Sequence, residues 1–220
     1  MSRYTIYPGT TLLLEPRYCG SIGWYGAMAA HEHCIVDYGA RFDKRHKLTH
    51  RTTIADVNGR LDLTVPVSHT RRLDTEGDRH PLTWHDITLS SHGDWWNVHR
   101  VALESSYGRT PYFEFYIDRF LPVYRPDVVE RMVTLENINR HIDREVRLLL
   151  DLPAEDAEVP TGEIIDMRNR EPEPVAPIPY YQVRASRLGF IAGLSILDLL
   201  FNMGPEAKLY LYKAIRAYDK

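Results

Sequence analysis

The sequence predicts one α/β domain, with a mixed central sheet built from an N-terminal βαβ unit and an antiparallel hairpin, and a largely helical second half. Three observations support this fold class. Two apolar segments, residues 10–14 and 33–37, flank a helix-like segment over residues 21–30. The pair Asn58-Gly59 separates two β-rich segments, which is typical of a hairpin. From residue 128 onwards, apolar side chains recur at helical spacing.

The βαβ unit includes a loop at a position where ligands commonly bind. Ser21 is predicted to cap the helix over residues 21–30. Residues 15–20 therefore join the carboxyl end of a strand to the N-terminus of a helix. Because ligands of open α/β sheets bind at such strand ends, we expect this loop to line a functional cleft.

The hairpin is predicted from strands over residues 50–57 and 60–67, with a tight turn at Asn58-Gly59. A short strand is expected at residues 87–89, ahead of a Trp-rich helix. Asp94 is predicted to cap that helix. At helical spacing along one face of the helix lie Trp96, His99, Leu103 and Tyr107.

The second half is predicted to consist of helices separated by a connector. The spacing of apolar residues over 128–150 predicts one long amphipathic helix or two in succession. Residues 152–179 hold six prolines and seven acidic residues, which is typical of a solvated connector, and only residues 163–168 within them are strand-like. A last helix is expected over residues 194–203, before the stop at Gly204-Pro205.

Composition limits the functional classes. The chain has 220 residues, a net charge of −3 and 44% hydrophobic residues, so we expect a globular protein without a nucleic-acid partner. Only two cysteines are present, and no signal peptide or membrane-spanning apolar run is recognisable. These features predict a cytoplasmic protein with no integral membrane segment.

Two polar segments each allow two interpretations. His31-Glu32-His33 could present two imidazoles from one strand face to a metal ion. Because a third and a fourth ligand cannot be named, we favour an exposed helix-to-strand turn and expect no bound metal. The basic residues from Arg41 to Arg51, which include Lys44, could bind a phosphate or carboxylate or could form a solvated loop.

His99 and Asp198 are the candidate catalytic residues. The His99 imidazole could act as a general base, or it could be a hydrogen-bonded core residue. Asp198 lies in an apolar helix, where a carboxylate needs either a hydrogen-bond partner or a cavity. It could cap a neighbouring loop or act in catalysis. The aromatic side chains of Trp96 and Tyr107 suit either core packing or stacking on a sugar ring.

A series of motifs in the same order resembles the WbqC-like protein family over nearly the whole chain, as one domain over residues 1–220. The matching segments are Glu15-Pro16-Arg17-Tyr18, Gly23-Trp24-Tyr25, Asp37, His50-Arg51, Gly59, Leu63-Thr64-Val65-Pro66, Trp95, His99, Tyr107, Pro111-Tyr112-Phe113, Tyr181-Gln182 and Leu194 to Pro205. The chain departs from the family pattern at Glu15, where the pattern has Gln, and at His50, where it has Asn.

The resemblance implies a role in bacterial surface-polysaccharide biosynthesis, similar to O-antigen assembly. It implies a transferase that moves an aminoacyl group such as glycine, or another acyl group, to an activated amino sugar. The expected substrate is a small molecule such as a nucleotide-linked amino sugar, and no cofactor is identified. The alternative is a non-catalytic protein that binds a glycan or a partner enzyme.

In the transferase interpretation, His99 is the general base and Asp198 orients His99 or the acceptor. Lys44 and Arg51 hold an anionic group. The other expected substrate-binding residues are Tyr18, Asp37, His92, Trp95, Tyr107, Gln182 and Asn202. We expect the cleft between loop 15–20, the basic segment 44–51 and the face of the Trp-rich helix that carries His99.

Overall fold

The computed structural model describes residues 7–43, 45–69, 81–153, 156, 159–168 and 178–218. These residues form the predicted α/β fold. Most strands come from the first half of the chain and most helices from the second half. Within the described ranges, no helix is both long and apolar enough to cross a membrane.

A parallel sheet has the strand order β2-β1-β7, with β1 (Tyr7–Leu14) in the centre. The predicted βαβ unit consists of β1, α1 (Ile22–Ala30) and β2 (His31–Val36), in which the two strands run parallel. Ser21 caps α1 as predicted, because its hydroxyl accepts a hydrogen bond from the Trp24 amide at 3.1 Å. The third strand is β7 (Glu163–Asp166), which lies within the predicted connector and pairs with the other edge of β1.

The predicted turn at His31-Glu32-His33 is instead the start of β2. His31 is only 8% exposed, and its Nδ1–H donates to the Ala27 carbonyl at 2.8 Å. The helix therefore passes directly into the strand. Among the residues that the structure describes, no group of three or more His, Cys, Asp and Glu side chains could hold a metal ion.

The predicted hairpin consists of β3 (Arg51–Asp56) and β4 (Gly59–Thr64). Its turn lies one residue earlier than predicted, at Val57 and Asn58, because Gly59 already pairs with Asp56. Gly59 supplies the positive φ, 111°. The two strands pair with each other rather than with the parallel sheet.

The second antiparallel pair consists of β5 (Val67–His69) and β6 (Ile87–Leu89). The predicted Trp-rich helix follows as α2 (Trp95–Tyr107). Asp94 occupies the N-cap position but has a left-handed φ of 43°, and its side chain makes no capping hydrogen bond. The most buried side chains of the predicted stripe lie four residues apart and begin one residue earlier than expected: Trp95, His99, Leu103 and Tyr107.

The second half of the chain is largely helical and includes α7 (Ile196–Met203). The segment 128–150 forms two helices, α4 (Val128–Met132) and α5 (Leu135–Leu150), as the second of the two alternatives predicted. The last predicted helix, α7, begins after its cap Ser195, two residues later than expected. The helices without a prediction are α3 (Phe113–Phe120), the short α6 (Ala185–Leu188) and α8 (Ala207–Tyr218).

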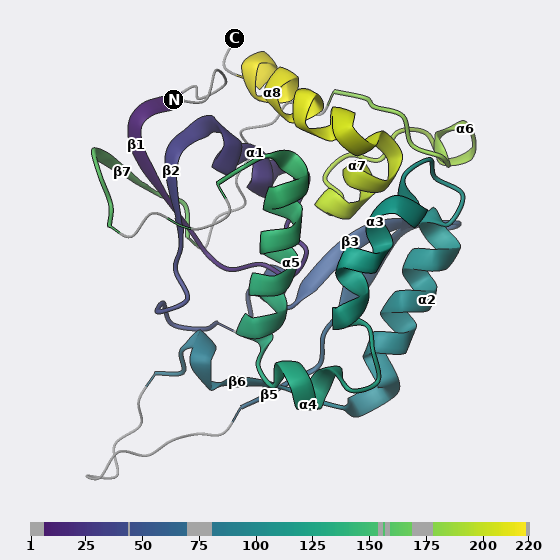
Figure 1. The fold of residues 1–220 in the computed structure, drawn as a ribbon, viewed down its shortest axis with the longest axis horizontal. Helices are drawn as coiled ribbons and strands as arrows, with labels where there is room; N and C mark the ends of the chain where they lie inside the picture. Colours follow the sequence, from purple (N-terminus) through teal and green to yellow (C-terminus); the bar gives the residue numbers. More distant parts are fainter. Residues whose placement is uncertain are drawn as a thin grey trace.

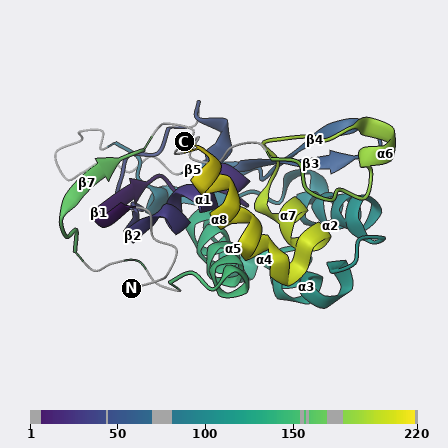
Figure 2. The ribbon, with the colours of Figure 1, turned by 90° about the horizontal axis from the view of Figure 1, so that it is seen from above.

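Helix α7 lies in the centre of the core. The side chains from Ile196 to Phe201 are at most 1% exposed. The helix contacts α1, α2, α3, α8 and β3, and Figure 1 shows it between α5 and the α2–α3 pair. Figure 2 shows the parallel strands at one end of the molecule and the β3–β4 hairpin with α2 at the other.

Candidate functional site

A cavity of about 340 Å³ opens beside the loop that follows β1. Three arginines line it, and we call it the arginine cleft. They are Arg17 from the loop, Arg51 at the start of β3 and Arg60 in β4. The rest of the wall comes from residues 18–21, Leu48, Thr52, Thr53 and residues 193–195.

Hydrogen bonds hold the arginines of the hairpin in place. The Nε of Arg51 donates to the Thr64 hydroxyl at 2.8 Å, and its Nη1 donates to the Asp62 carboxylate at 3.1 Å. Arg60 donates to the carbonyl of Ala192. Among the described residues, the Arg60 guanidinium bonds only the backbone carbonyls of Ala192 and Gly193, so its charge stays available to an anion.

Two helices begin at the wall of the arginine cleft. Ser21 caps α1 and Ser195 caps α7, and both residues line the cavity. The two starts are joined, because the Ile22 amide donates to the Leu194 carbonyl at 3.1 Å and the Ile196 amide donates to the Gly20 carbonyl at 2.9 Å. Helix N-termini carry partial positive charge, so they add to the field of the arginines.

His99 lies in the core behind Tyr18. It is 2% exposed, and its Nδ1 lies 2.8 Å from the Tyr18 hydroxyl. A second hydrogen bond joins its ring to the backbone of Thr64. Burial lowers the pKa of His99 to about 4, and the Thr64 hydrogen bond opposes this shift. Neither ring nitrogen is available to a substrate in this arrangement, so the geometry favours packing over the predicted catalytic role.

Asp198 lies in the first turn of α7 and is 1% exposed. Its hydrogen-bond partners differ from those of His99. Its Oδ2 accepts hydrogen bonds from the Tyr180 hydroxyl and, at 3.0 Å, from the Gln182 side chain. Burial raises the pKa of the Asp198 carboxyl, while the neighbouring polar side chains of Tyr180, Tyr107 and Gln182 oppose the rise. Asn202 donates to the Asp198 carbonyl at 2.8 Å. Four predicted site residues therefore form one buried cluster.

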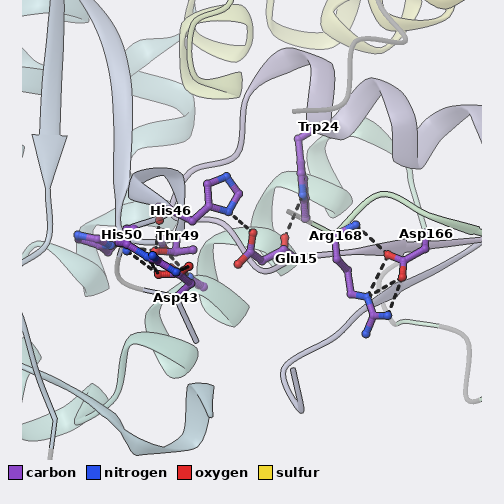
Figure 3. Close-up of polar contacts among 10 residues, drawn as sticks. Glu15, Trp24, Asp43, His46, Thr49, His50, Asp166 and Arg168 are labelled. Atoms are coloured by element: carbon purple, nitrogen blue, oxygen red, sulfur yellow. Dashed lines mark hydrogen bonds and ion pairs between the residues drawn. The ribbon is translucent and has the colours of Figure 1, made fainter. Parts of the chain in front are cut away.

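A histidine–carboxylate pair lies at the carboxyl end of β1. Glu15, 3% exposed, follows the strand directly, and Nδ1–H of His46 donates to its carboxylate. Figure 3 shows the other ring nitrogen of His46 pointing away from Glu15. In the neutral ring that second nitrogen, Nε2, is a proton acceptor.

Ion pairs join the two outer strands of the parallel sheet, β2 and β7, at their carboxyl ends. Asp37 follows β2, and its carboxylate accepts from Nη1 of Arg168 at 2.6 Å. The same guanidinium forms a forked pair with Asp166 at the end of β7, as Figure 3 shows. Arg168 thus links the two strands that flank β1.

The WbqC-like protein family model matches residues 15–159, well over half of the chain. The chain belongs to the WbqC-like protein family. Comparisons with curated proteins and with solved structures gave no match. In this WbqC-like protein the matched range holds all three arginines of the cleft and His99, whereas Asp198 lies beyond it.

The remaining predicted site residues of the WbqC-like protein lie apart from one another. Lys44 is outside the described residues. His92 is exposed in the turn before α2. Trp95 is 3% exposed and packs edge-on against His99, with ring centroids 5.3 Å apart.

The expected cleft had three walls: loop 15–20, the basic segment 44–51 and the face of the Trp-rich helix that carries His99. Residues of the loop and Arg51 of the basic segment line the arginine cleft, but His99 does not.

The sequence alone does not single out several residues of this site. Arg17 is recognisable only as part of a motif, although its place after a strand is a usable signal. Arg60 and the Glu15–His46 pair depend on contacts between segments far apart in the sequence. No periodic pattern in a single sequence carries that information.

Proposed function

We propose that this chain is a transferase of surface-polysaccharide biosynthesis that binds a nucleotide-linked amino sugar in the arginine cleft. The observation that carries the proposal is the convergence of Arg17, Arg51 and Arg60 on one cavity of about 340 Å³. Guanidinium groups bind phosphates through paired hydrogen bonds, and pockets for small molecules commonly have about 300–1,000 Å³. Family membership supports the polysaccharide context.

The proposed transfer needs a group that accepts the proton of the attacking amine or hydroxyl. His46 suits this role better than His99, because it is 23% exposed and its Nδ1 is held by Glu15. Glu15 lies two residues before Arg17, and His46 lies two residues before Leu48 in the same cleft wall. We assign His46 as the candidate base and Glu15 as its positioning residue.

The test is to incubate the purified protein with UDP-linked amino sugars and with acyl donors, namely acetyl-coenzyme A or glycine with ATP, and to follow the mass of the sugar. We expect an increase by the mass of the transferred group. His46→Ala should abolish the increase and retain sugar-nucleotide binding, while His85→Ala should leave both unchanged. His85 is the matched control, because it also pairs with a carboxylate, that of Glu136.

The alternative is a non-catalytic binding protein, and the burial of both His99 and Asp198 favours it. This alternative requires no proton acceptor at the cleft. Binding of sugar nucleotides by the wild type without any mass change across the donor panel would support it over the transferase.

A further inference from the structure

The Asp198 cluster contains a carboxylate oxygen without a partner. Tyr180 and Gln182 bind Oδ2, whereas Oδ1 is buried and has no hydrogen-bond partner among the described residues. An unpaired buried acceptor is costly, so such a group is rare in a folded protein. The free oxygen is therefore a sign of a binding position.

A donor without a partner lies in the same place. Arg184 uses Nη2 to bind the Ser105 carbonyl at 2.7 Å, but its Nε is buried and has no partner within the described part of the chain. Arg184 and Asp198 both line one small cavity of about 10 Å³, together with Tyr107 and Asn202. We call this cavity the Asp198 pocket.

The chemistry of the Asp198 pocket selects a hydroxyl group. A hydroxyl oxygen can accept from Nε–H of Arg184 while its hydrogen is donated to Oδ1 of Asp198. An ammonium group would be repelled by Arg184, and a carboxylate or phosphate would be repelled by Asp198. The volume also limits the occupant to about the size of one water molecule.

Three segments of the chain contribute residues both to the Asp198 pocket and to the arginine cleft. In β3, Thr53 lines the cleft and Ala55 lines the pocket. The chain after α6 contributes residue 191 to the pocket and residue 193 to the cleft, and the start of α7 contributes residue 195 to the cleft and residue 198 to the pocket. Two residues of extended chain span about 7 Å, which is the size of a sugar ring.

We infer that the Asp198 pocket is a second subsite, which takes one hydroxyl group of a sugar whose phosphate groups occupy the arginine cleft. The inference rests on the proposed function and adds to it the recognition of the sugar. Asp198 and Arg184 then bind the ligand as a complementary acceptor and donor. Gln182 keeps the carboxylate in place, because it also bonds both backbone groups of Ile191.

The experiment measures the affinity of the purified full chain for UDP and for UDP-glucosamine by titration calorimetry. In the wild type we expect UDP-glucosamine to bind about tenfold more tightly than UDP, which is the effect of pairing buried polar groups. Asp198→Asn and Arg184→Lys should each remove most of this difference and leave the affinity for UDP unchanged. Arg187→Lys is the control, because Arg187 lies in α6, which Arg184 precedes, but does not line the pocket; this variant should behave as the wild type.

Each outcome decides between the two proposals. If both variants keep the sugar preference, or if the wild type has none, the pocket holds only water and the inference is overturned. If neither UDP nor UDP-glucosamine binds, the proposed function fails and the inference fails with it. Arg184→Lys keeps the test valid if Asp198→Asn does not fold, because Arg184 lies at the rim of the core rather than inside it.

Discussion

His99 shows how burial lowers the pKa of a residue that normally titrates near neutrality. Its ring is enclosed by Trp95, Tyr18 and Tyr124, and hydrogen bonds reach it from two sides. A sequence pattern identifies such a histidine but does not distinguish a base from a packed ring, because both occur on the buried face of a helix. The pKa of about 4 makes the distinction measurable.

We predict that His99 makes the stability of the protein depend on pH. Its pKa is about 4 in the folded protein and about 6.5 in the unfolded chain, so only the unfolded chain takes up a proton between these values. The free energy of unfolding should therefore fall by up to about 3 kcal/mol as the pH decreases from 6.5 to 4, and the contribution should be constant above that window. Urea unfolding across the window checks this, with His99→Gln showing a shallower slope. Equal slopes would contradict the assignment.

A second prediction at the residue scale concerns the arginine cleft. Arg51→Ala should weaken the binding of UDP by about tenfold or more, because a charge-assisted contact contributes about 1.5–3 kcal/mol. Arg45→Ala is the control, since Arg45 lies in the same basic segment but is 90% exposed and paired with Asp43. Titration calorimetry of both variants should show a loss only for Arg51→Ala. A similar loss in both would indicate a diffuse charge effect instead of a site.

At the scale of elements, local signals were sufficient where the chain makes local contacts. The Ser21 cap, the βαβ unit and the hairpin of β3 and β4 follow from caps, periodicity and turn residues. The two helices over residues 128–150 correspond to one of the two alternatives that the apolar spacing left open. Non-local contacts were not accessible in this way. Residues 163–168 are strand-like in the sequence, but three of the four residues of β7 are exposed, so its pairing with β1 could not be predicted.

The same limit applies to the candidate site. Tyr18, Arg51 and Asp198 were identified from motifs, but their grouping into a cleft and a separate pocket depends on where the segment after α6 packs. That packing is determined by contacts such as the bond from the Ser195 amide to the Thr53 carbonyl at 2.8 Å. Such a bond between distant segments has no signature in a single sequence.

The pairing of β7 with β1 yields a prediction for Gly162. An alanine Cβ at Gly162 would lie 1.9 Å from the carbonyl oxygen of Gly9, and φ there is +68°. Gly9 is the matched control, because its φ is +69° but an added Cβ meets nothing within 4 Å. Both alanine variants should lose about 1–2 kcal/mol from the positive φ, and only Gly162→Ala should also detach β7. Hydrogen exchange of the Met167 amide, which bonds the Leu13 carbonyl, should accelerate in that variant alone.

At the scale of the whole molecule, the family match ends at residue 159 but the core does not. Helix α7 is buried on all sides and supplies some of the most enclosed side chains of the chain, including Leu199, Leu200 and Phe201. The Phe201 ring packs against three other aromatic rings, those of Tyr107, Phe113 and Phe120. The last helices therefore complete the core that the matched segment begins.

We predict that the full chain unfolds as one cooperative unit and that residues 1–179 do not fold alone. Removing α7 and α8 would expose the apolar faces of α1, α2 and α3 to water, and each buried apolar side chain contributes about 1.5–3 kcal/mol. Thermal unfolding of the full chain should give coincident transitions by tryptophan fluorescence and far-ultraviolet circular dichroism. The truncated chain should lack a cooperative transition. Two separate transitions in the full chain, or a cooperatively folded 1–179 fragment, would show that residues 1–179 fold independently of α7 and α8, because a core shared with α7 cannot survive its removal.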